Sequence, residues 1–318
     1  MALGEFDLID RYFRRDVQRA DLGVGDDCAL LTPAPGMQLA TTSDLLVEGR
    51  HFVSTVAPER LGHKALAVNL SDLAACGATP LAFTLALSMP RVHEPFVASF
   101  ARGLFALADA HGCELVGGDT TQGPLTLCIT AFGEVPAGQA LLRSGARAGD
   151  DVWVSGTFGD ARLALEVLRG AQSLPGTAFD AVRVAMELPQ PRVALGVALR
   201  GVATSAIDVS DGLLGDLTHI LRRSRVGATL EVDAVPRSAH LAALPLQVQR
   251  VCTLSGGDDY ELAFTAPAQH AARVQAAGTA AGVRVTRIGR VDAEPGLRLR
   301  DGQGAALDEH FASFDHFA

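Results

Sequence analysis

Residues 58–89, PERLGHKALAVNLSDLAACGATPLAFTLALSM, decide the fold class of this chain. Pro58 suits the first turn of a helix, the leucines of 66–73 recur at helical spacing, and Gly77 stands where a helix would end. The apolar run at 81–89 predicts a buried strand. The stretch therefore predicts a helix followed directly by a strand, the succession from which α/β proteins are built.

The same succession continues on both sides of this stretch. Further helices are expected at 5–17, 94–111, 159–169, 191–200 and 211–224. Further strands are expected at 37–44, 114–116, 125–135, 152–154, 204–209, 228–232, 260–265 (with Glu261 outside the core) and 283–290. The turn-rich segment 136–150 separates the two halves. The sequence therefore predicts an α/β (or α+β) protein with two domains, 1–137 and 149–318.

Composition excludes several classes of protein. The 318 residues are 48% hydrophobic, which excludes a disordered chain, and the net charge of −9 disfavours nonspecific nucleic-acid binding. We expect no membrane segment, because no apolar run approaches the roughly 20 residues that a spanning helix needs. The five cysteines are scattered without a C-x-x-C pair, so buried, reduced thiols and a cytoplasmic location are expected. An anionic ligand would need a divalent cation to approach this acidic protein.

Aspartates gather in six short clusters, most of them at a predicted strand end or helix start. The clusters are Gly25-Asp26-Asp27, Thr42-Ser43-Asp44, Asn69-Leu70-Ser71-Asp72, Gly117-Gly118-Asp119, Asp208-Val209-Ser210-Asp211 and Gly256-Gly257-Asp258-Asp259. A single Asp beside Gly is ordinarily a turn residue, and Asp211 also suits a helix N-cap. Six such clusters in one chain additionally suggest a shared binding role.

The side chains of these clusters favour Mg²⁺ and phosphate. They offer carboxylate and hydroxyl oxygens and almost no His or Cys, which suits Mg²⁺ better than zinc or iron. Asn69 and Asp72 share one face of an otherwise apolar helix, where a carboxylate needs a partner or a cation. Gly117 and Gly118 would let backbone N–H groups approach a phosphate. Because Walker and protein-kinase motifs are absent, a Mg²⁺-polyphosphate site of another type is expected.

Motifs along nearly the whole chain resemble those of the thiamine-monophosphate kinase family, within the aminoimidazole-ribonucleotide-synthetase superfamily. The resemblance implies a two-domain PurM-like fold, whose N-terminal mixed sheet joins that of a partner in a homodimer. Two positions depart from the family pattern: Asp258 stands where Glu is usual, and Thr42-Ser43 where Ser-Thr is common. The matching segments are 4–9, 23–29, 67–78, 117–121, 207–213, 255–262 and 314–317.

The resemblance also implies roles for individual residues. Implied metal ligands are Asp27, Thr42, Ser43, Asp44, Asp72, Asp119, Asp208 and Asp211. Implied ATP contacts are Gly118, Asp119, Arg143 and Ser210, and implied thiamine-phosphate contacts are His51, Asp258 and Phe314. The expected activity is transfer of the ATP γ-phosphate to thiamine monophosphate, with several Mg²⁺ ions as cofactors. Two alternatives stay open: another ATP-using enzyme of the superfamily, or a non-catalytic nucleotide or thiamine-phosphate sensor.

Overall fold

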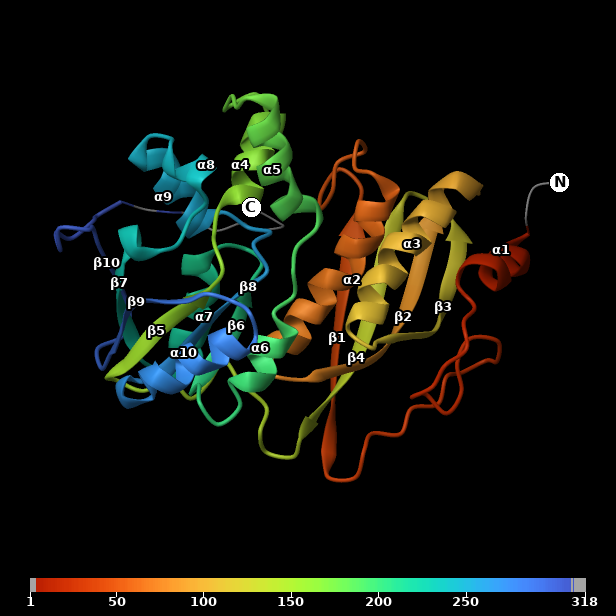
Figure 1. Ribbon diagram of the computed structural model, residues 1–318, viewed down its shortest axis with the longest axis horizontal. Coiled ribbons are helices and arrows are strands. Elements are labelled where there is room, and N and C mark those ends of the chain that lie inside the picture. Colours follow the sequence, from red (N-terminus) through yellow and green to blue (C-terminus); the bar gives the residue numbers. More distant parts are fainter. Residues whose placement is uncertain (1–3, 310, 312–318) are drawn as a thin grey trace. The chain divides into compact units, whose positions relative to one another are not determined.

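The computed structural model describes residues 4–309 and 311, and the chain divides into two compact units. Unit 1 comprises Met1–Leu73 with Ala78–Gly138, and unit 2 comprises Ala74–Gly77 with Gln139–Ala318. Each unit contains one sheet with helices (Figure 1), so the predicted α/β class and two-part organisation are confirmed. The boundaries 1–137 and 149–318 stay a prediction. None of the helices in the described residues is both long and apolar enough to cross a membrane.

Unit 1 has a four-stranded mixed sheet with two long helices across one face (Figure 1). Its strand order is β1-β4-β2-β3; β4 is antiparallel to β1 and β2, whereas β2 and β3 are parallel. Helices α2 and α3 bury most of their apolar residues, and each is followed within two residues by a glycine at positive φ, Gly77 and Gly112. The elements are α1 (Glu5–Tyr12), β1 (Met37–Val47), α2 (Pro58–Ala75), β2 (Thr79–Met89), α3 (Glu94–Ala110), β3 (Glu114–Gln122) and β4 (Thr126–Pro136).

Unit 2 has a six-stranded sheet in the order β10-β7-β9-β5-β8-β6. Its core is formed by buried aliphatic residues of the strands and of α7. The strands are β5 (Asp150–Ser155), β6 (Ser205–Val209), β7 (Gly227–Glu231), β8 (Glu261–Pro267), β9 (Val285–Asp292) and β10 (Gly296–Arg300). The helices are α4 (Asp160–Leu168), α5 (Gly176–Glu187), α6 (Val193–Ala198), α7 (Leu213–Ser224), α8 (Ala239–Ala242), α9 (Leu246–Ser255) and α10 (Ala271–Ala280), with short 3₁₀ turns η1 (Val232–Ala234) and η2 (Ala268–His270).

Three local expectations need correction. The first helix ends at Tyr12 rather than at residue 17. Strand β3 does not end at residue 116 but continues through Gly117 and Gly118 to Gln122. It continues because β2 pairs with it from Glu114 to Gln122, with one register shift between Phe83 and Thr84 of β2. The five cysteines are free thiols, but Cys28 and Cys76 are exposed rather than buried.

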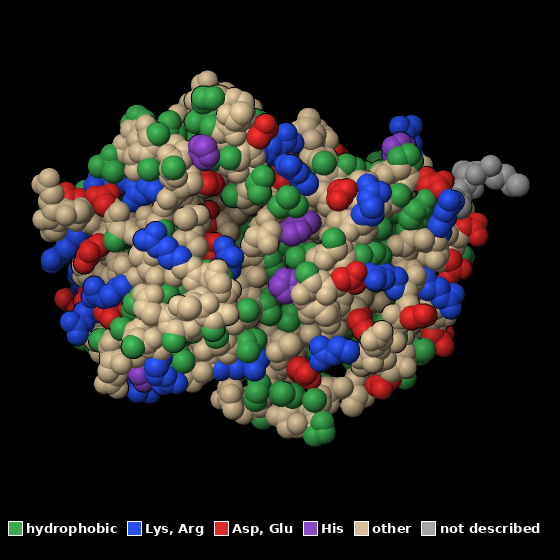
Figure 2. All heavy atoms as spheres, viewed as in Figure 1, with side chains coloured by type: hydrophobic (Ala, Val, Ile, Leu, Met, Phe, Trp, Pro, Cys, Tyr) green, Lys and Arg blue, Asp and Glu red, His purple; other side chains and the backbone are tan. Residues whose placement is uncertain are grey.

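Acidic and basic side chains alternate over the face of the molecule drawn in Figure 2. The net charge of −9 does not favour an anion, so local groups such as backbone N–H donors or a bound cation have to supply the attraction.

Candidate functional site

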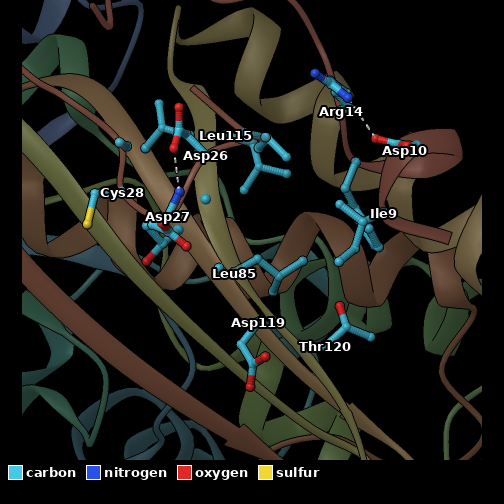
Figure 3. A pocket seen from close by; sticks show the side chains of 18 of the residues that line it. Ile9, Asp10, Arg14, Asp26, Asp27, Cys28, Leu85, Leu115, Asp119 and Thr120 are labelled. Carbon is cyan, nitrogen blue, oxygen red and sulfur yellow. Dashed lines mark hydrogen bonds and ion pairs between the residues drawn. The ribbon is translucent and has the colours of Figure 1, made fainter. Parts of the chain in front are cut away.

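A cavity of about 920 Å³ opens in unit 1 between α1, the loop at 24–29 and the edge strand β3. Figure 3 shows Asp26 and Asp27 on the loop side, Asp119 and Thr120 on β3, and Ile9 on α1. The part of the lining formed by β3 is rich in glycine, whereas α1 contributes both apolar side chains, Phe6 and Ile9, and carboxylates, Glu5 and Asp10. The cavity therefore offers apolar and charged surroundings to a ligand.

Gly118 lines this cavity without contributing a side chain. Its φ is +146°, and a Cβ at this position would lie 1.9 Å from the carbonyl oxygen of Leu85 on β2, so no side chain is accommodated. Because β3 is the edge of the sheet, alternate N–H groups of β3 have no strand partner and point away from β2. Gly117 and Gly118 thus present bare backbone to the cavity, as the sequence predicts for a phosphate-binding segment.

Asp27 and Asp119 are the two predicted metal ligands that line this cavity. Both are exposed, and the backbone N–H of Asp27 donates to Oδ1 of Asp26 at 3.0 Å. Asp10 and Arg14 form an ion pair of 3.0 Å at the α1 side (Figure 3). Oxygen donors and one guanidinium are therefore available within a single opening.

Thr42, Asp44 and Asp72 lie on the helix-covered face of the sheet of unit 1. Thr42 Oγ1 donates a hydrogen bond to Oδ2 of Asp72 on α2, and side-chain alternation places Asp44 on the same face of β1 as Thr42. Ser43 points to the opposite face, where its hydroxyl lies 2.9 Å from that of Thr130. Asp119 of β3 pairs with Ala86 of β2, which pairs with Cys128 of β4, which in turn pairs with Leu45 of β1. Directly paired residues point to the same face of a sheet, so Asp119 lies on the same face as Leu45 and Ser43.

His51 follows β1 and is held by the backbone of that strand. Its Nδ1 accepts a hydrogen bond of 3.0 Å from the N–H of Val47, and Nζ of Lys64 donates to the His51 carbonyl at 3.3 Å. With Nδ1 acting as an acceptor, a neutral His51 carries its proton on Nε2. The ring is therefore held with its N–H donor at Nε2, the nitrogen that does not bond to Val47.

In unit 2 the segment 208–212 follows β6 and precedes α7. Asp208 is buried at 6% exposure, and Oδ2 of Asp216 accepts hydrogen bonds from the N–H groups of Ser210, Asp211 and Gly212 at 3.1, 3.0 and 3.2 Å. Burial raises the pKa of Asp216 to about 7, although these hydrogen bonds oppose the rise. The N-cap of α7 is Gly212, so the interpretation of Asp211 as the N-cap is wrong.

A second turn, 256–260, lies directly against this segment. The N–H of Asp258 donates to the carbonyl of Ser210 at 2.8 Å, and the N–H of Tyr260 donates to that of Val209 at 2.8 Å. Asp258 and Tyr260 have φ values of 66° and 50°. This left-handed region suits Asp better than Glu, because the shorter polar side chain is tolerated there. The departure from the family's Glu therefore fits the local backbone.

Asp259, in the same turn, carries a buried carboxyl group. Its Oδ1 accepts a hydrogen bond of 2.8 Å from the N–H of Gly159, while Oδ2 is buried without a hydrogen-bond partner in the described part of the chain. Burial raises the pKa of Asp259 well above its usual value. Burial therefore makes the charged form of Asp259 less favourable than that of an exposed aspartate.

Glu261 is buried at 4% exposure, which corrects the expectation that it lies outside the core. Ser155 Oγ donates to its Oε2 at 2.5 Å, Arg192 Nε donates to Oε2 at 2.6 Å, and Arg192 Nη2 pairs with Oε1. The position is enclosed further by Gly156, whose absent Cβ would overlap the carboxylate. The Glu261 carboxylate is thus paired and hydrogen-bonded in the interior of unit 2.

Arg143 lies in the exposed connection before β5, next to α7. The Ser224 hydroxyl donates to the Arg143 carbonyl at 3.2 Å. Burial first, and then the charges of Arg143 and Arg222, lower the pKa of His219 on α7. Arg143 therefore lies beside the helix that begins with the 208–212 segment. Phe314, predicted on the thiamine-phosphate side, lies outside the described residues.

The predicted metal ligands fit Mg²⁺ in chemistry, but the protein alone does not complete a metal site. Within residues 4–309 and 311, no three His, Cys, Asp or Glu side chains are grouped closely enough to hold a metal. Mg²⁺ typically takes one or two carboxylates and completes its shell with water and substrate phosphate oxygens. The pairing of Thr42 with Asp72, and the shared cavity of Asp27 and Asp119, are consistent with that mode.

Sequence reasoning missed two residues that shape these turns, Asp216 and Arg192, and gave Asp259 no role of its own within its cluster. Asp216 stands in the first turn of a predicted helix, where an acidic residue is a usual capping signal. Asp259 was visible only as a neighbour of Asp258. Nothing in the sequence pairs Arg192 with Glu261, since the two are 69 positions apart.

Two sequence families match this chain in tandem. Residues 25–135 match the family described as AIR synthase related protein, N-terminal domain, and residues 137–302 match its C-terminal domain. The chain therefore belongs to the AIR synthase-related proteins, the class that its fold and its aspartate clusters define.

Relatives of full length narrow this assignment. The thiamine-monophosphate kinase of Salmonella typhimurium is 45% identical, with 100% of this chain and 99% of the relative covered. The crystal structure of thiamine-monophosphate kinase from Stenotrophomonas maltophilia K279a is 45% identical, has a TM-score of 0.86 and covers 96% of this chain and 99% of its own. A structure named AaThiL complexed with AMPPCP and TMP is 28% identical, has a TM-score of 0.78 and covers 99% and 97%. Within its class, the chain belongs to the thiamine-monophosphate kinase family, with the PurM-like fold.

Proposed function

We propose that this protein transfers the γ-phosphoryl group of ATP to thiamine monophosphate, which gives thiamine diphosphate and ADP. The observation that carries this proposal is the full-length similarity, at 45% identity, to thiamine-monophosphate kinases. The cavity of unit 1 that Gly117 and Gly118 line, and the two hydrogen-bonded segments 208–212 and 256–260 of unit 2, would supply the binding segments that such a reaction needs.

The chemistry requires positioning and charge neutralisation more than it requires a general base. A phosphate oxygen of thiamine monophosphate attacks the γ-phosphorus, and the bond to the β,γ-bridging oxygen breaks, so ADP leaves with that electron pair. The acceptor is a phosphate monoester with a second pKa near ~6, so it is already mostly dianionic at neutral pH. Two unit charges about 4 Å apart repel by roughly 4 kcal/mol at an effective dielectric of 20, and this repulsion must be overcome.

We propose Mg²⁺ as the agent that neutralises this charge. The ligands would be Asp27, Thr42, Ser43, Asp44, Asp72 and Asp119 of unit 1, and Asp208 and Asp211 of unit 2. Bound Mg²⁺ supplies Lewis-acid stabilisation of the charge on the transferring phosphoryl group. Gly118 and Ser210 would hold ATP through the backbone and a hydroxyl, and Arg143 would form a fork to phosphate oxygens. His51, Asp258 and Phe314 would contact the thiamine phosphate.

Purified protein is expected to release ADP and form thiamine diphosphate only when ATP, Mg²⁺ and thiamine monophosphate are all present. The measurement is a coupled ADP assay together with chromatography of the thiamine products, and EDTA is expected to abolish turnover. Absence of thiamine diphosphate under all Mg²⁺ concentrations would refute the proposed function. ADP release with a different acceptor would favour another superfamily enzyme, and binding of thiamine phosphate without turnover would favour a sensor.

We also propose that the protein is a cytoplasmic homodimer joined through the face of the unit 1 sheet that is opposite α2 and α3. On the outer strand β1, Leu39 and Leu45 lie on one face and are 46% and 53% exposed. Alternate residues between them, Thr41 and Ser43, are exposed as well. A strip of exposed leucines and small hydroxyl side chains on one face of a sheet suits a second copy of the same strip. The free, widely spaced thiols suit a reducing compartment.

In light scattering after size exclusion, the protein is expected to have twice the 33.2 kDa mass of one chain. Leu45→Glu is expected to give the monomer, because it places a charge in the proposed contact. Leu142→Glu serves as the control, since Leu142 is similarly exposed at 55% but lies in unit 2. A monomeric wild-type protein, or a Leu45→Glu variant that remains dimeric, would contradict this interface.

A further inference from the structure

Three consecutive backbone N–H groups converge on one side-chain oxygen in unit 2. Oδ2 of Asp216 accepts from Ser210, Asp211 and Gly212 at 3.1, 3.0 and 3.2 Å. The Asp216 side chain is buried, at 5% exposure for the residue. N–H groups that lose their partners away from water are costly, so the N–H side of this segment depends on that single oxygen.

The opposite edge of the same segment is fixed by backbone alone. The carbonyls of Val209 and Ser210 accept hydrogen bonds from Tyr260 and Asp258, both at 2.8 Å. A Cβ on Gly257 would lie 2.6 Å from the Ser210 carbonyl oxygen, so the two segments are in close contact. The carbonyl edge would keep these bonds if Asp216 changed, whereas the N–H edge would lose its acceptor.

We propose that Asp216 is a positioning residue: its carboxyl group sets the backbone of Ser210–Gly212, and thereby the directions in which the Ser210 and Asp211 side chains point. This inference rests on the proposed function, in which these two side chains contact ATP and metal. Among the residues that the structure describes, Asp216 accepts hydrogen bonds from the backbone of this segment, and it acts through that backbone. Its role resembles that of the outer-shell partners that orient ligands of metal sites.

A plain helix cap is the competing explanation. Asp216 lies in the first turn of α7, and a side chain there commonly reaches back to the N-cap N–H, here that of Gly212. A cap would require that one bond. The additional bonds to Ser210 and Asp211 extend beyond the helix into the proposed binding segment, and it is these that a positioning role needs.

The test compares Asp216→Asn with Asp233→Asn. Asn keeps the size of the side chain but is a weaker acceptor for N–H groups. Asp233 is a matched control in the same unit: it also accepts three hydrogen bonds, from Nε and Nη2 of Arg250 and from the N–H of Gly302, and none from the 208–212 segment. Thermal unfolding of both variants measures the purely structural cost of each replacement.

Two readouts separate positioning from stability. In metal-free, ligand-free protein, hydrogen exchange at the Ser210–Gly212 amides is expected to be at least about tenfold faster in Asp216→Asn, with β6 and β8 still protected. In the kinase assay, the Mg²⁺ concentration for half-maximal rate is expected to rise about 10- to 100-fold, with a KM for thiamine monophosphate that changes much less. Asp233→Asn is expected to lower the melting temperature without either change.

The outcomes are distinguishable from a failure of the proposed function. If wild-type protein makes no thiamine diphosphate, the function fails, while the exchange readout still tests whether Asp216 fixes the segment. If wild-type protein is active but Asp216→Asn shows only a lowered melting temperature, Asp216 is a structural cap and the inference is wrong. Should Asp216→Asn not fold, Asp216→Glu, which keeps the charge and displaces the oxygen by one methylene, is expected to show the same shifts, and wild-type values there would overturn the inference.

Discussion

Replacing Asp119 by Asn is expected to lower the turnover of thiamine monophosphate by about 10² or more, because a misplaced metal or phosphate costs that much in an in-line transfer. Asp119 is exposed in the cavity beside Gly118, and we propose that it contacts both metal and ATP. Asn keeps the shape and removes the charge. The measurement is kcat from steady-state assays at saturating ATP and Mg²⁺.

The control for this experiment is Asp109→Asn in the same unit. Asp109 is an exposed carboxylate on α3 that pairs with Arg15 at 3.0 Å and does not line the cavity. A surface ion pair of this kind contributes little, so both turnover and stability are expected to stay near wild type. Near-normal turnover of Asp119→Asn would remove Asp119 from the proposed machinery.

Glu261→Gln is expected to destabilise the protein by about 3–5 kcal/mol, because breaking a buried ion pair leaves the other charge without its partner. The Glu261 side chain is 5% exposed and that of Arg192 is 23% exposed, so water cannot readily replace the lost interaction. Ser155 Oγ also loses a charged acceptor. The free energy of unfolding from urea titration, analysed with a constant m-value, measures the loss.

Glu294→Gln provides the comparison at the surface. Glu294 pairs with Arg298 at 3.2 Å, but the Glu294 side chain is 85% exposed, so a change within about 0.5 kcal/mol is expected. If Glu261→Gln lost no more than Glu294→Gln, the interior pair would contribute nothing to folding. A double variant with apolar residues at 192 and 261 is expected to recover part of the loss, since neither charge is then left unpaired.

The strongly periodic elements could be predicted from the sequence. The leucines of α2 and the apolar stripe of α3 recur at helical spacing, and the apolar run of β2 is typical of a buried strand. The structure contains all three elements. The aspartate clusters could also be recognised from the sequence, because the combination of Asp, Ser and Gly at strand ends is unusual. The structure places two of those clusters, around Asp27 and Asp119, in one cavity.

Elements whose formation depends on tertiary partners could not be predicted. Helix α10 is rich in Ala and lacks a clear apolar stripe, and α5 begins at Gly176 immediately after a proline. Gly117 and Gly118 have low strand propensity, yet β2 supplies a ladder that carries β3 through them. Similarly, burial of Glu261 depends on Arg192, whose proximity arises only in the folded chain.

The hydrogen bond from the Asp258 N–H to the Ser210 carbonyl joins main chain to main chain, so every residue except proline at position 258 keeps its donor. A substitution that moves the backbone at position 258 is expected to move the 208–212 segment as well. If the proposed contacts with acceptor and nucleotide hold, laboratory evolution toward a new acceptor would have to select compensating changes on both sides of that bond.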